Sequence, residues 1–270
     1  MKKLLAIVLT AAMLLAMLCA CAAKTDTATN NPANAKATVG ILMPTKEQTI
    51  WSIQGDRLTE AFQKAGYATQ IEYAEDDSAK QAMQIENMIT KGVNVMVIAA
   101  VDCAALTDAC EKAKDAGIYV IADDRLITNT KAVDFYVTFD LVRMGELQGQ
   151  YIVDKLDLEN QAGPFTLEIF SGSQDDTNAI SFYEGAMNKL QPYLDSGKLV
   201  VKSGQSSYTE TAIQSWDSSK AQSRMDNLLS GYYSDSHLDA VLVAADCLAL
   251  GVISSLESMG YGTEANPYPI

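Results

Sequence analysis

Short apolar runs alternate with longer amphipathic stretches from residue 38 onward. The runs are rich in β-branched and aromatic residues and are bounded by polar residues, Gly or Pro, which is typical of strands. In the first half of the chain they predict strands at residues 38–43, 68–73, 95–99, 118–122 and 133–139. Stretches with helical periodicity between them predict helices at residues 56–65, 78–91 and 103–116, each followed by a Gly.

The same pattern restarts after residue 140. It predicts strands at residues 165–170, 199–202 and 240–244, and helices at residues 144–156, 177–190, 218–229 and 246–259. Apolar strands that alternate with helices form βαβ units, which build parallel sheets covered on both faces. We therefore predict an α/β fold with two lobes, residues 38–139 and 140–270, each a parallel sheet flanked by helices. The ending Tyr268-Pro269-Ile270 looks like the start of a further strand, so we expect the second lobe to be C-terminally truncated.

The first 20 residues have the pattern of a signal peptide. Two Lys precede an apolar run, residues 4–18, that is too short to span a membrane comfortably. The following Leu18-Cys19-Ala20-Cys21 is similar to the end of a lipoprotein signal, and this resemblance implies cleavage before Cys21 and lipidation of its sulfur. The alternative is an ordinary secretory signal with two incidental Cys. Residues 21–37 are predicted to form a lipidated tether, because their composition cannot build a core.

The composition disfavours several classes of partner. The net charge of −14 opposes binding to nucleic acid and direct contact with a membrane surface, which leaves the lipid anchor as the only predicted membrane contact. Beyond Cys21 the remaining Cys are Cys103, Cys110 and Cys247, an odd number that makes no disulfide framework. Cys103 and Cys110 lie on one predicted helix, about 10 Å apart along its axis, which is too far for a bridge. The sequence contains neither zinc spacing nor a calcium loop, so we expect no metal and no other cofactor.

Polar and aromatic residues follow nearly every predicted strand. Because the carboxyl ends of parallel strands meet at one edge of a sheet, and ligands bind outside that edge, these residues are candidates for a binding site. The candidates are Trp51, Asp102, Asp124, Arg125, Asp176, Asn178, Trp216 and Asp246.

The chemistry of this set suits a sugar. Carboxylates accept the protons of sugar hydroxyls, while Arg and Asn supply matching donors in planar pairs. The chain has two Trp, Trp51 and Trp216, and both fall at this edge, where an indole face can stack on the apolar side of a sugar ring. The coincidence across strands, more than any single residue, indicates a sugar site.

Local explanations exist for several of these residues. A carboxylate after a strand also caps the next helix, which is the alternative for Asp102, Asp140 and Asp246. Trp51 would also fit an ordinary core. Asp124 and Arg125 would also form a local ion pair.

Longer stretches of the sequence resemble one protein family. The stretches are Tyr73-Ala-Glu-Asp-Asp77, Gln84-Ile-Glu-Asn-Met-Ile-Thr-Lys-Gly92, Val95-Met-Val-Ile-Ala-Ala100, Ile121-Ala-Asp-Asp-Arg-Leu-Ile127, Gly172-Ser-Gln-Asp-Asp-Thr-Asn-Ala179, Trp216-Asp217 and Ala221-Gln-Ser-Arg-Met-Asp-Asn-Leu-Leu229. They resemble the type I periplasmic binding proteins that serve ABC transporters for xylose, glucose, galactose and other sugars. The similarity runs from about residue 38 to residue 270.

The resemblance implies a specific architecture and set of partners. It implies two lobes joined by segments that cross between them three times, with a monosaccharide held between the lobes. It implies that the eight candidates are sugar contacts, with Asp176 the faintest match. It also implies an ABC permease and its ATPase as partners, with a chemoreceptor or sensor kinase in some members, at an extracytoplasmic location.

Several positions depart from the family pattern. Ile50 stands where the family usually has an Arg, Asp123 stands where an aromatic residue is usual, and Cys247 replaces a Gly or Ala. These departures leave the identity of the sugar open. Family members also continue with a segment whose Gly-Gln-Asp stretch supplies a further sugar-contacting Asp, so we expect this chain to bind weakly or to fold incompletely.

Other functions fit the sequence less well. An enzyme needs a nucleophile with its base or a metal set, yet the single His, His237, lies in a polar stretch and no catalytic motif occurs. Asp123 and Asp124 are adjacent on a strand end and point in different directions, which does not suit glycoside hydrolysis. A transcriptional regulator would carry a basic helix-turn-helix where this chain has its signal. We therefore predict a receptor and not an enzyme, with a sugar or signal sensor as the open alternative.

Overall fold

The computed structural model of the protein describes residues 35–270. The predicted signal peptide, Cys21 and most of the predicted tether lie outside these residues. Lys36 bonds to the first lobe, because its backbone N–H donates to Gly66 O and its Nζ donates to Ala65 O, each at 3.0 Å. Among the described residues, no helix has the length and apolar character needed to cross a bilayer.

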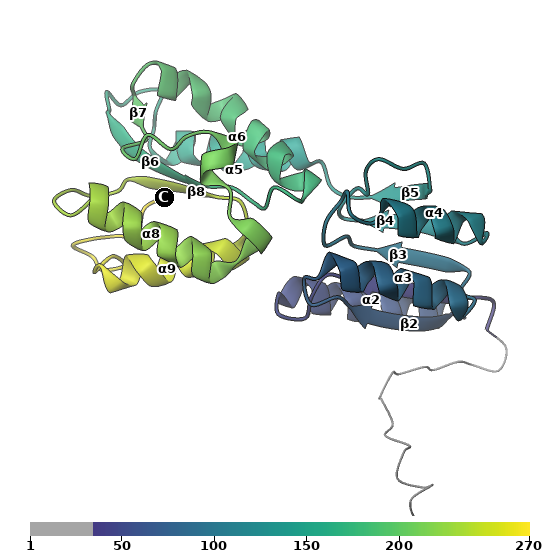
Figure 1. The fold of residues 1–270 in the computed structure, drawn as a ribbon. Helices are drawn as coiled ribbons and strands as arrows, with labels where there is room; N and C mark the ends of the chain where they lie inside the picture. Colours follow the sequence, from purple (N-terminus) through teal and green to yellow (C-terminus); the bar gives the residue numbers. More distant parts are fainter. Residues whose placement is uncertain (1–34) are drawn as a thin grey trace, which may run out of the picture.

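The first lobe is built on a five-stranded parallel sheet with the order β2-β1-β3-β4-β5. Its strands are β1 (Thr38–Met43), β2 (Ala68–Tyr73), β3 (Val95–Ile98), β4 (Tyr119–Asp123) and β5 (Val133–Val137). Its helices are α2 (Thr49–Lys64), α3 (Ser78–Thr90) and α4 (Thr107–Asp115). Figure 1 shows this lobe at the right, in purple to blue-teal.

The second lobe has a smaller parallel sheet with the order β7-β6-β8. Its strands are β6 (Phe165–Phe170), β7 (Leu199–Val200) and β8 (Ala240–Val243). Its helical segments are α5 (Leu141–Lys155), α6 (Thr177–Asp195), α7 (Tyr208–Thr211), η1 (Gln214–Trp216), α8 (Ser218–Tyr232) and α9 (Asp246–Ser258). In Figure 1 the α5–α6 pair lies above this sheet and the α8–α9 pair below it. The predicted α/β fold with two parallel sheets is confirmed.

The apolar residues of each strand are divided between two cores, one on each face of the sheet. In the first lobe, Leu42 and Ile98 lie in the core under α3 and α4, whereas Ile41 and Val97 face the α2 side. This division follows from the alternation of side chains along a strand. The second lobe repeats it, with one core under α5 and α6 and another under α8 and α9. Both faces carry apolar residues, which is why the strands read as continuous apolar runs.

Three predicted helices differ from the structure by four or more residues at one end. Helix α2 begins at Thr49, seven residues before the predicted start at Asp56. No side chain caps this end of the helix, so the sequence offered no capping signal for the earlier start. Helix α4 begins at Thr107, so Cys103 precedes the helix, and the prediction that Cys103 and Cys110 share one helix is wrong. Both Cys are free thiols. Helix α6 continues through Pro192 to Asp195, beyond its predicted end at residue 190.

The last residue extends the second sheet. The backbone N–H of Ile270 donates to Asp239 O at 2.9 Å, and its carbonyl accepts from Val241 N–H at 2.8 Å. This is the pattern of one residue on a parallel neighbour of β8. Ile270 alone makes this pairing, so the further strand stays a prediction.

Candidate functional site

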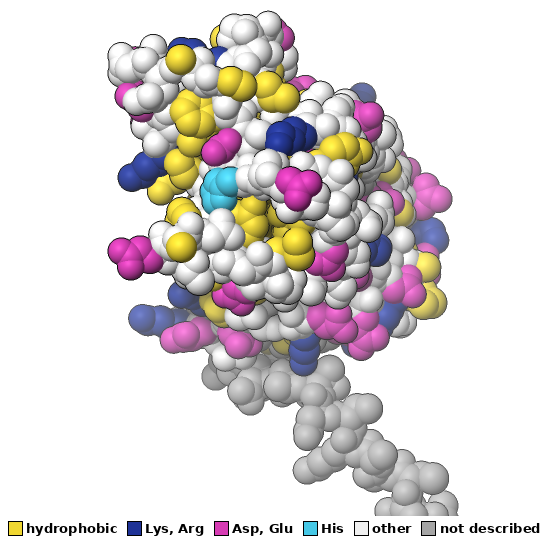
Figure 2. All heavy atoms as spheres, turned by 90° about the vertical axis from the view of Figure 1, so that its left-hand side faces the viewer, with side chains coloured by type: hydrophobic (Ala, Val, Ile, Leu, Met, Phe, Trp, Pro, Cys, Tyr) yellow, Lys and Arg dark blue, Asp and Glu magenta, His cyan; other side chains and the backbone are white. Residues whose placement is uncertain are grey.

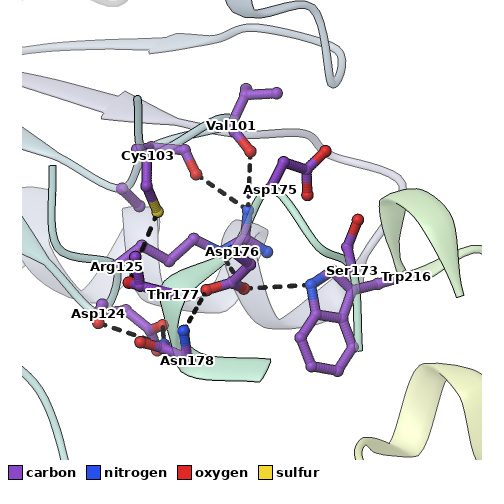
Figure 3. A network of polar contacts seen from close by, with 12 residues as sticks. Val101, Cys103, Asp124, Arg125, Ser173, Asp175, Asp176, Thr177, Asn178 and Trp216 are labelled. Atoms are coloured by element: carbon purple, nitrogen blue, oxygen red, sulfur yellow. Dashed lines mark hydrogen bonds and ion pairs between the residues drawn. The ribbon is translucent and has the colours of Figure 1, made fainter. Parts of the chain in front are cut away.

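The carboxyl ends of strands from the two lobes face each other. The loop after β3 meets the start of α6, because the Cys103 N–H donates to Asp175 O at 3.1 Å and Cys103 Sγ lies 3.7 Å from Thr177 Oγ1. The turn after β4 meets the same helix through Asp124 and Asn178. Figure 3 shows these groups together, with residues of the first lobe on one side and the start of α6 on the other. The predicted edge of candidate residues is therefore shared between the lobes.

Asp124 reaches the second lobe because the chain turns sharply after β4. Its φ is +63°, in the left-handed region that Asp tolerates better than most residues, and its N–H donates to Val137 O at 2.8 Å. Asp124 Oδ1 accepts a 2.6 Å hydrogen bond from Asn178 Nδ2. Asn178 is buried, and its Oδ1 has no hydrogen-bond partner among the described residues. The amide therefore keeps one unused acceptor at the interface.

Arg125 forms an ion pair across the lobes. Its Nε lies 2.8 Å from Asp176 Oδ2, and both side chains are buried. The Nε–H does not point at that oxygen and makes no hydrogen bond with any described residue, while Nη1 donates to Ala100 O at 2.9 Å. The structure thus pairs Arg125 with Asp176 of the other lobe, and no ion pair joins it to its neighbour Asp124 in the described part of the chain.

Asp176 has two further roles. Its Oδ1 accepts from Asn178 N–H at 2.9 Å and caps α6, and its Oδ2 accepts from Trp216 Nε1 at 3.1 Å. One buried carboxylate therefore orients Arg125 and Trp216 together. Asp176 was the faintest candidate in the sequence, yet it lies at the centre of the network in Figure 3.

The two Trp rings approach the network from opposite lobes. The Trp51 ring lies in the α2-side core with its centroid 5.0 Å from the Arg125 guanidinium carbon, and its Nε1 donates to Gln48 Oε1 at 3.1 Å. Trp51 is therefore both a core residue, as its alternative interpretation predicted, and a neighbour of Arg125. Trp216 follows Ser215, and both residues have positive φ, +53° and +61°. A Cβ placed on Gly172 would come within 2.0 Å of the Trp216 ring, so a Gly is required beneath it.

Two predicted contacts lie outside this network. Asp102 Oδ1 accepts from the backbone N–H groups of Ala104 and Ala105, at 2.7 and 3.0 Å, which is the local role of a turn cap. Asp246 is exposed, begins α9 without capping it, and bonds to no described side chain. As ligand contacts both stay predictions. Asp140 caps α5 by accepting from Arg143 N–H at 3.0 Å, as its capping alternative predicted.

Burial raises the pKa of both interface carboxyls. Desolvation raises the pKa of Asp176, and the Arg125 charge opposes this rise. Desolvation also raises the pKa of Asp124, again opposed by Arg125, while the nearby Asp176 charge adds to the rise. The site therefore contains two desolvated carboxyl groups, and the charge of Arg125 offsets only part of the desolvation cost of their ionised forms.

Sequence reasoning missed some residues that the structure brings to this region. Gln54, three residues after Trp51 on α2, donates from Nε2 to Asp123 Oδ2 at 2.6 Å. Its helical spacing from Trp51 was the available signal, because residues three apart share a helix face. Gly172 and Thr177 lie in residues 172–179, a stretch that carried the family resemblance, but neither residue type by itself indicates a binding role.

The residue types that commonly bind metals are dispersed in the described part of the chain. His237, the single His of the chain, lies on the surface and bonds through Nδ1 to Asn266 Oδ1 at 3.0 Å. In residues 35–270, no group of three or more His, Cys, Asp or Glu is arranged to hold a metal ion. Figure 2 shows the outer face of the second lobe, where acidic and basic side chains are interspersed.

Comparison with known proteins gives the family. The model of the periplasmic binding protein domain matches residues 39–267. The multiple sugar-binding periplasmic receptor ChvE of Rhizobium radiobacter is 53% identical over 235 residues, which cover 87% of this chain and 66% of that protein. The multiple sugar-binding periplasmic protein SbpA of Azospirillum brasilense is 51% identical over the same shares of the two chains.

A solved structure agrees with these sequence relatives. An ABC transporter solute-binding protein of Clostridium phytofermentans, crystallised with bound β-D-glucose, is 44% identical, with a TM-score of 0.81. The match covers 86% of this chain and 70% of that one. This chain thus spans just under two thirds of the length of its curated relatives. With the family model matched over nearly all described residues, the chain belongs to the periplasmic binding protein family.

Proposed function

We propose that this protein is an extracytoplasmic receptor that binds a monosaccharide between its two lobes and delivers it to an ABC permease and its ATPase. The observation that carries the proposal is a pair of buried polar atoms at the lobe interface that make no hydrogen bond with a described residue: Asn178 Oδ1, and Arg125 Nε, which is ion-paired with Asp176. A buried donor or acceptor without a partner costs about 1–3 kcal/mol. A sugar hydroxyl can donate to Asn178 Oδ1 and accept from Arg125 Nε, whereas an apolar ligand can do neither.

The surrounding groups extend the same chemistry. Asp124 and Asp176 are acceptors for further hydroxyls, and the rings of Trp51 and Trp216 are available for the apolar face of a sugar. Two relatives are described as multiple sugar-binding, and a solved relative holds β-D-glucose, which supports an aldose as the ligand. We include Asp102 and Asp246 among the proposed sugar contacts, because they follow strands β3 and β8.

The binding proposal is tested by equilibrium dialysis of the chain from Ala22 onward against radiolabelled D-glucose, D-xylose, D-galactose and L-arabinose. Retention of one sugar that is recovered chemically unchanged supports a receptor. Retention of none contradicts the aldose assignment, and conversion of the sugar contradicts the receptor assignment. Asp124→Ala is the matched variant, because it removes one proposed contact and leaves the lobe cores intact.

We also propose that the mature protein is held at the membrane through lipid on Cys21. The support is the sequence Leu18-Cys19-Ala20-Cys21 after an apolar run. Metabolic labelling with palmitate should mark the wild-type chain and leave Cys21→Ser unlabelled. Equal labelling of the two chains would contradict the anchor. The alternative role is a sensor that reports to a kinase. Sugar uptake by cells with and without this receptor separates the two roles, because uptake depends on the receptor only if it serves transport.

A further inference from the structure

Asp123 is a buried carboxylate next to the proposed site that the sugar contacts do not use. It is the last residue of β4, and its exposed fraction is 8%. Its Oδ2 accepts from Gln54 Nε2 at 2.6 Å, and its other oxygen receives no hydrogen bond from a described residue. A buried charge with a single neutral partner needs an explanation.

The bond between Gln54 and Asp123 ties helix α2 to a strand that it hardly touches. Helix α2 packs on β1 and β2, and β3 lies between β1 and β4 in the sheet. Trp51 lies one turn before Gln54 on the same face of α2. The ring of Trp51 stacks on Arg125, which follows Asp123 by two residues. The bond therefore joins the helix that carries Trp51 to the strand end that precedes Arg125.

The electrostatics of Asp123 place its titration in an accessible range. Burial and, to a smaller extent, the neighbouring Asp124 charge raise the pKa of Asp123 from 3.8 to about 6, against the lowering effect of the Gln54 hydrogen bond. The groups that face Asp123 are Asp124 on its own turn, the uncharged Gln54 on α2, and the apolar Val137 paired with it on β5. A carboxylate accepts a stronger hydrogen bond than a neutral carboxyl does.

We propose that Asp123 and Gln54 form a positioning pair that holds Trp51 against Arg125 while Asp123 is ionised, and that protonation of Asp123 weakens sugar binding. The pair acts through α2 and does not itself touch the sugar. This inference rests on the proposed sugar site. It adds a response to pH that a neutral side chain at position 123 could not provide.

The size of the effect follows from proton linkage. If only the ionised form binds well, affinity follows the ionised fraction of Asp123, and a pKa of about 6 leaves roughly one molecule in ten ionised at pH 5. Affinity should therefore fall by up to about tenfold between pH 7.5 and pH 5. Asp124 and Asp176 also have raised pKa values, so the quantity that reports on Asp123 is the difference between two pH profiles.

The test compares calorimetric titrations of D-glucose, or of D-xylose if it binds more tightly, at pH 7.5, 6 and 5. Asp123→Asn carries no charge and cannot titrate, so it should bind at pH 7.5 about as weakly as the wild type does at pH 5, up to about tenfold below wild type at pH 7.5, and should lose the added pH dependence. Gln54→Leu removes the donor and should weaken binding already at pH 7.5. Gln63→Leu is the matched control, because Gln63 on the same helix bonds to Thr69 Oγ1 away from the site. Identical pH profiles for wild type and Asp123→Asn would overturn the inference.

A second signal does not depend on sugar. In a Trp216→Phe background the remaining emission comes from Trp51, the other Trp of the chain. It should titrate with a midpoint near the pKa of about 6 in the ligand-free protein, and this transition should vanish on adding Asp123→Asn. If no sugar binds at pH 7.5, the proposed function fails and the Trp51 titration alone decides whether the pair exists. If sugar binds but Trp51 does not respond, the positioning pair is wrong and the receptor stands.

Discussion

Replacing Gly172 with Ala should displace Trp216 and disturb the interface from within the second lobe. A Cβ at position 172 would lie 2.0 Å from Trp216 Cη2 and 2.2 Å from Cζ2, whereas ordinary carbon contacts are about 3.5–4.0 Å. The ring would have to move by roughly 1.5 Å to restore such a contact. The φ of Gly172 is not in the left-handed region, so the effect of the substitution is purely steric.

The magnitude combines two costs. Overpacking of this kind costs about 1–3 kcal/mol. Movement of the ring also breaks the 3.1 Å hydrogen bond from Trp216 Nε1 to the Asp176 carboxylate, and hydrogen bonds to charged groups contribute about 1.5–3 kcal/mol. We therefore expect Gly172→Ala to lower the free energy of unfolding by about 3 kcal/mol, because the neighbouring loop can absorb part of the strain.

Urea unfolding, followed by Trp fluorescence and circular dichroism, measures this change. Gly231→Ala is the matched control, because a Cβ there meets no atom within 4 Å and the residue lies near the end of α8. It should stabilise the protein by up to about 1 kcal/mol, since Ala is the better helix former. If Gly172→Ala unfolds within about 0.5 kcal/mol of wild type with unchanged Trp emission, the packing of Trp216 described above is wrong.

Three further predictions concern buried polar groups. Asp124→Asn should weaken sugar binding by about tenfold or more in calorimetry, because the Asn178 amide and a ligand hydroxyl lose a charged acceptor; unchanged affinity would remove Asp124 from the site. Tyr233→Phe should lower the free energy of unfolding in urea by about 1–3 kcal/mol, because the buried Glu168 carboxylate loses a 2.8 Å hydrogen bond; a loss below about 0.5 kcal/mol would contradict this. Asp123→Asn should raise the free energy of unfolding at pH 7.5 but not below pH 4. The pKa of Asp123 is raised by folding, so the wild-type protein loses stability as the pH rises from 3.8 through about 6, by at most roughly 3 kcal/mol, and the Asn variant does not. Urea midpoints at the two pH values check it, and an equal difference at both would contradict it.

The repeating apolar pattern was sufficient to predict the fold. Strands buried on both faces leave long apolar runs whose order and spacing imply parallel βαβ units, and β1, β2 and β6 match the predicted bounds. Helix starts were harder to predict. Helix α2 begins at Thr49 without a capping side chain, and α4 begins late because Asp102 caps a separate turn before it. Such details depend on local hydrogen bonds that compete with helix formation.

The sequence predicted which sheet edge carries the site, but not which side chains bond to one another there. Asp124, Arg125, Asp176, Asn178 and Trp216 were placed at strand ends by periodicity, and the structure brings them into contact across the lobes. Which group pairs with which depends on the relative position of the lobes and on one left-handed residue after β4, and neither follows from residue spacing. The tie between Gln54 and Asp123 was missed for the same reason.

Isothermal titration of D-glucose into the chain from Ala22 onward, beside Arg125→Met, shows whether the facing strand ends bind a monosaccharide. Arg125 supplies the unused donor and the partner of Asp176, so its removal should abolish binding while leaving the two cores in place. The wild-type chain should give saturable one-to-one heat, and Arg125→Met should give none. Equal binding by the two proteins would show that the sugar lies elsewhere and would contradict the site described here.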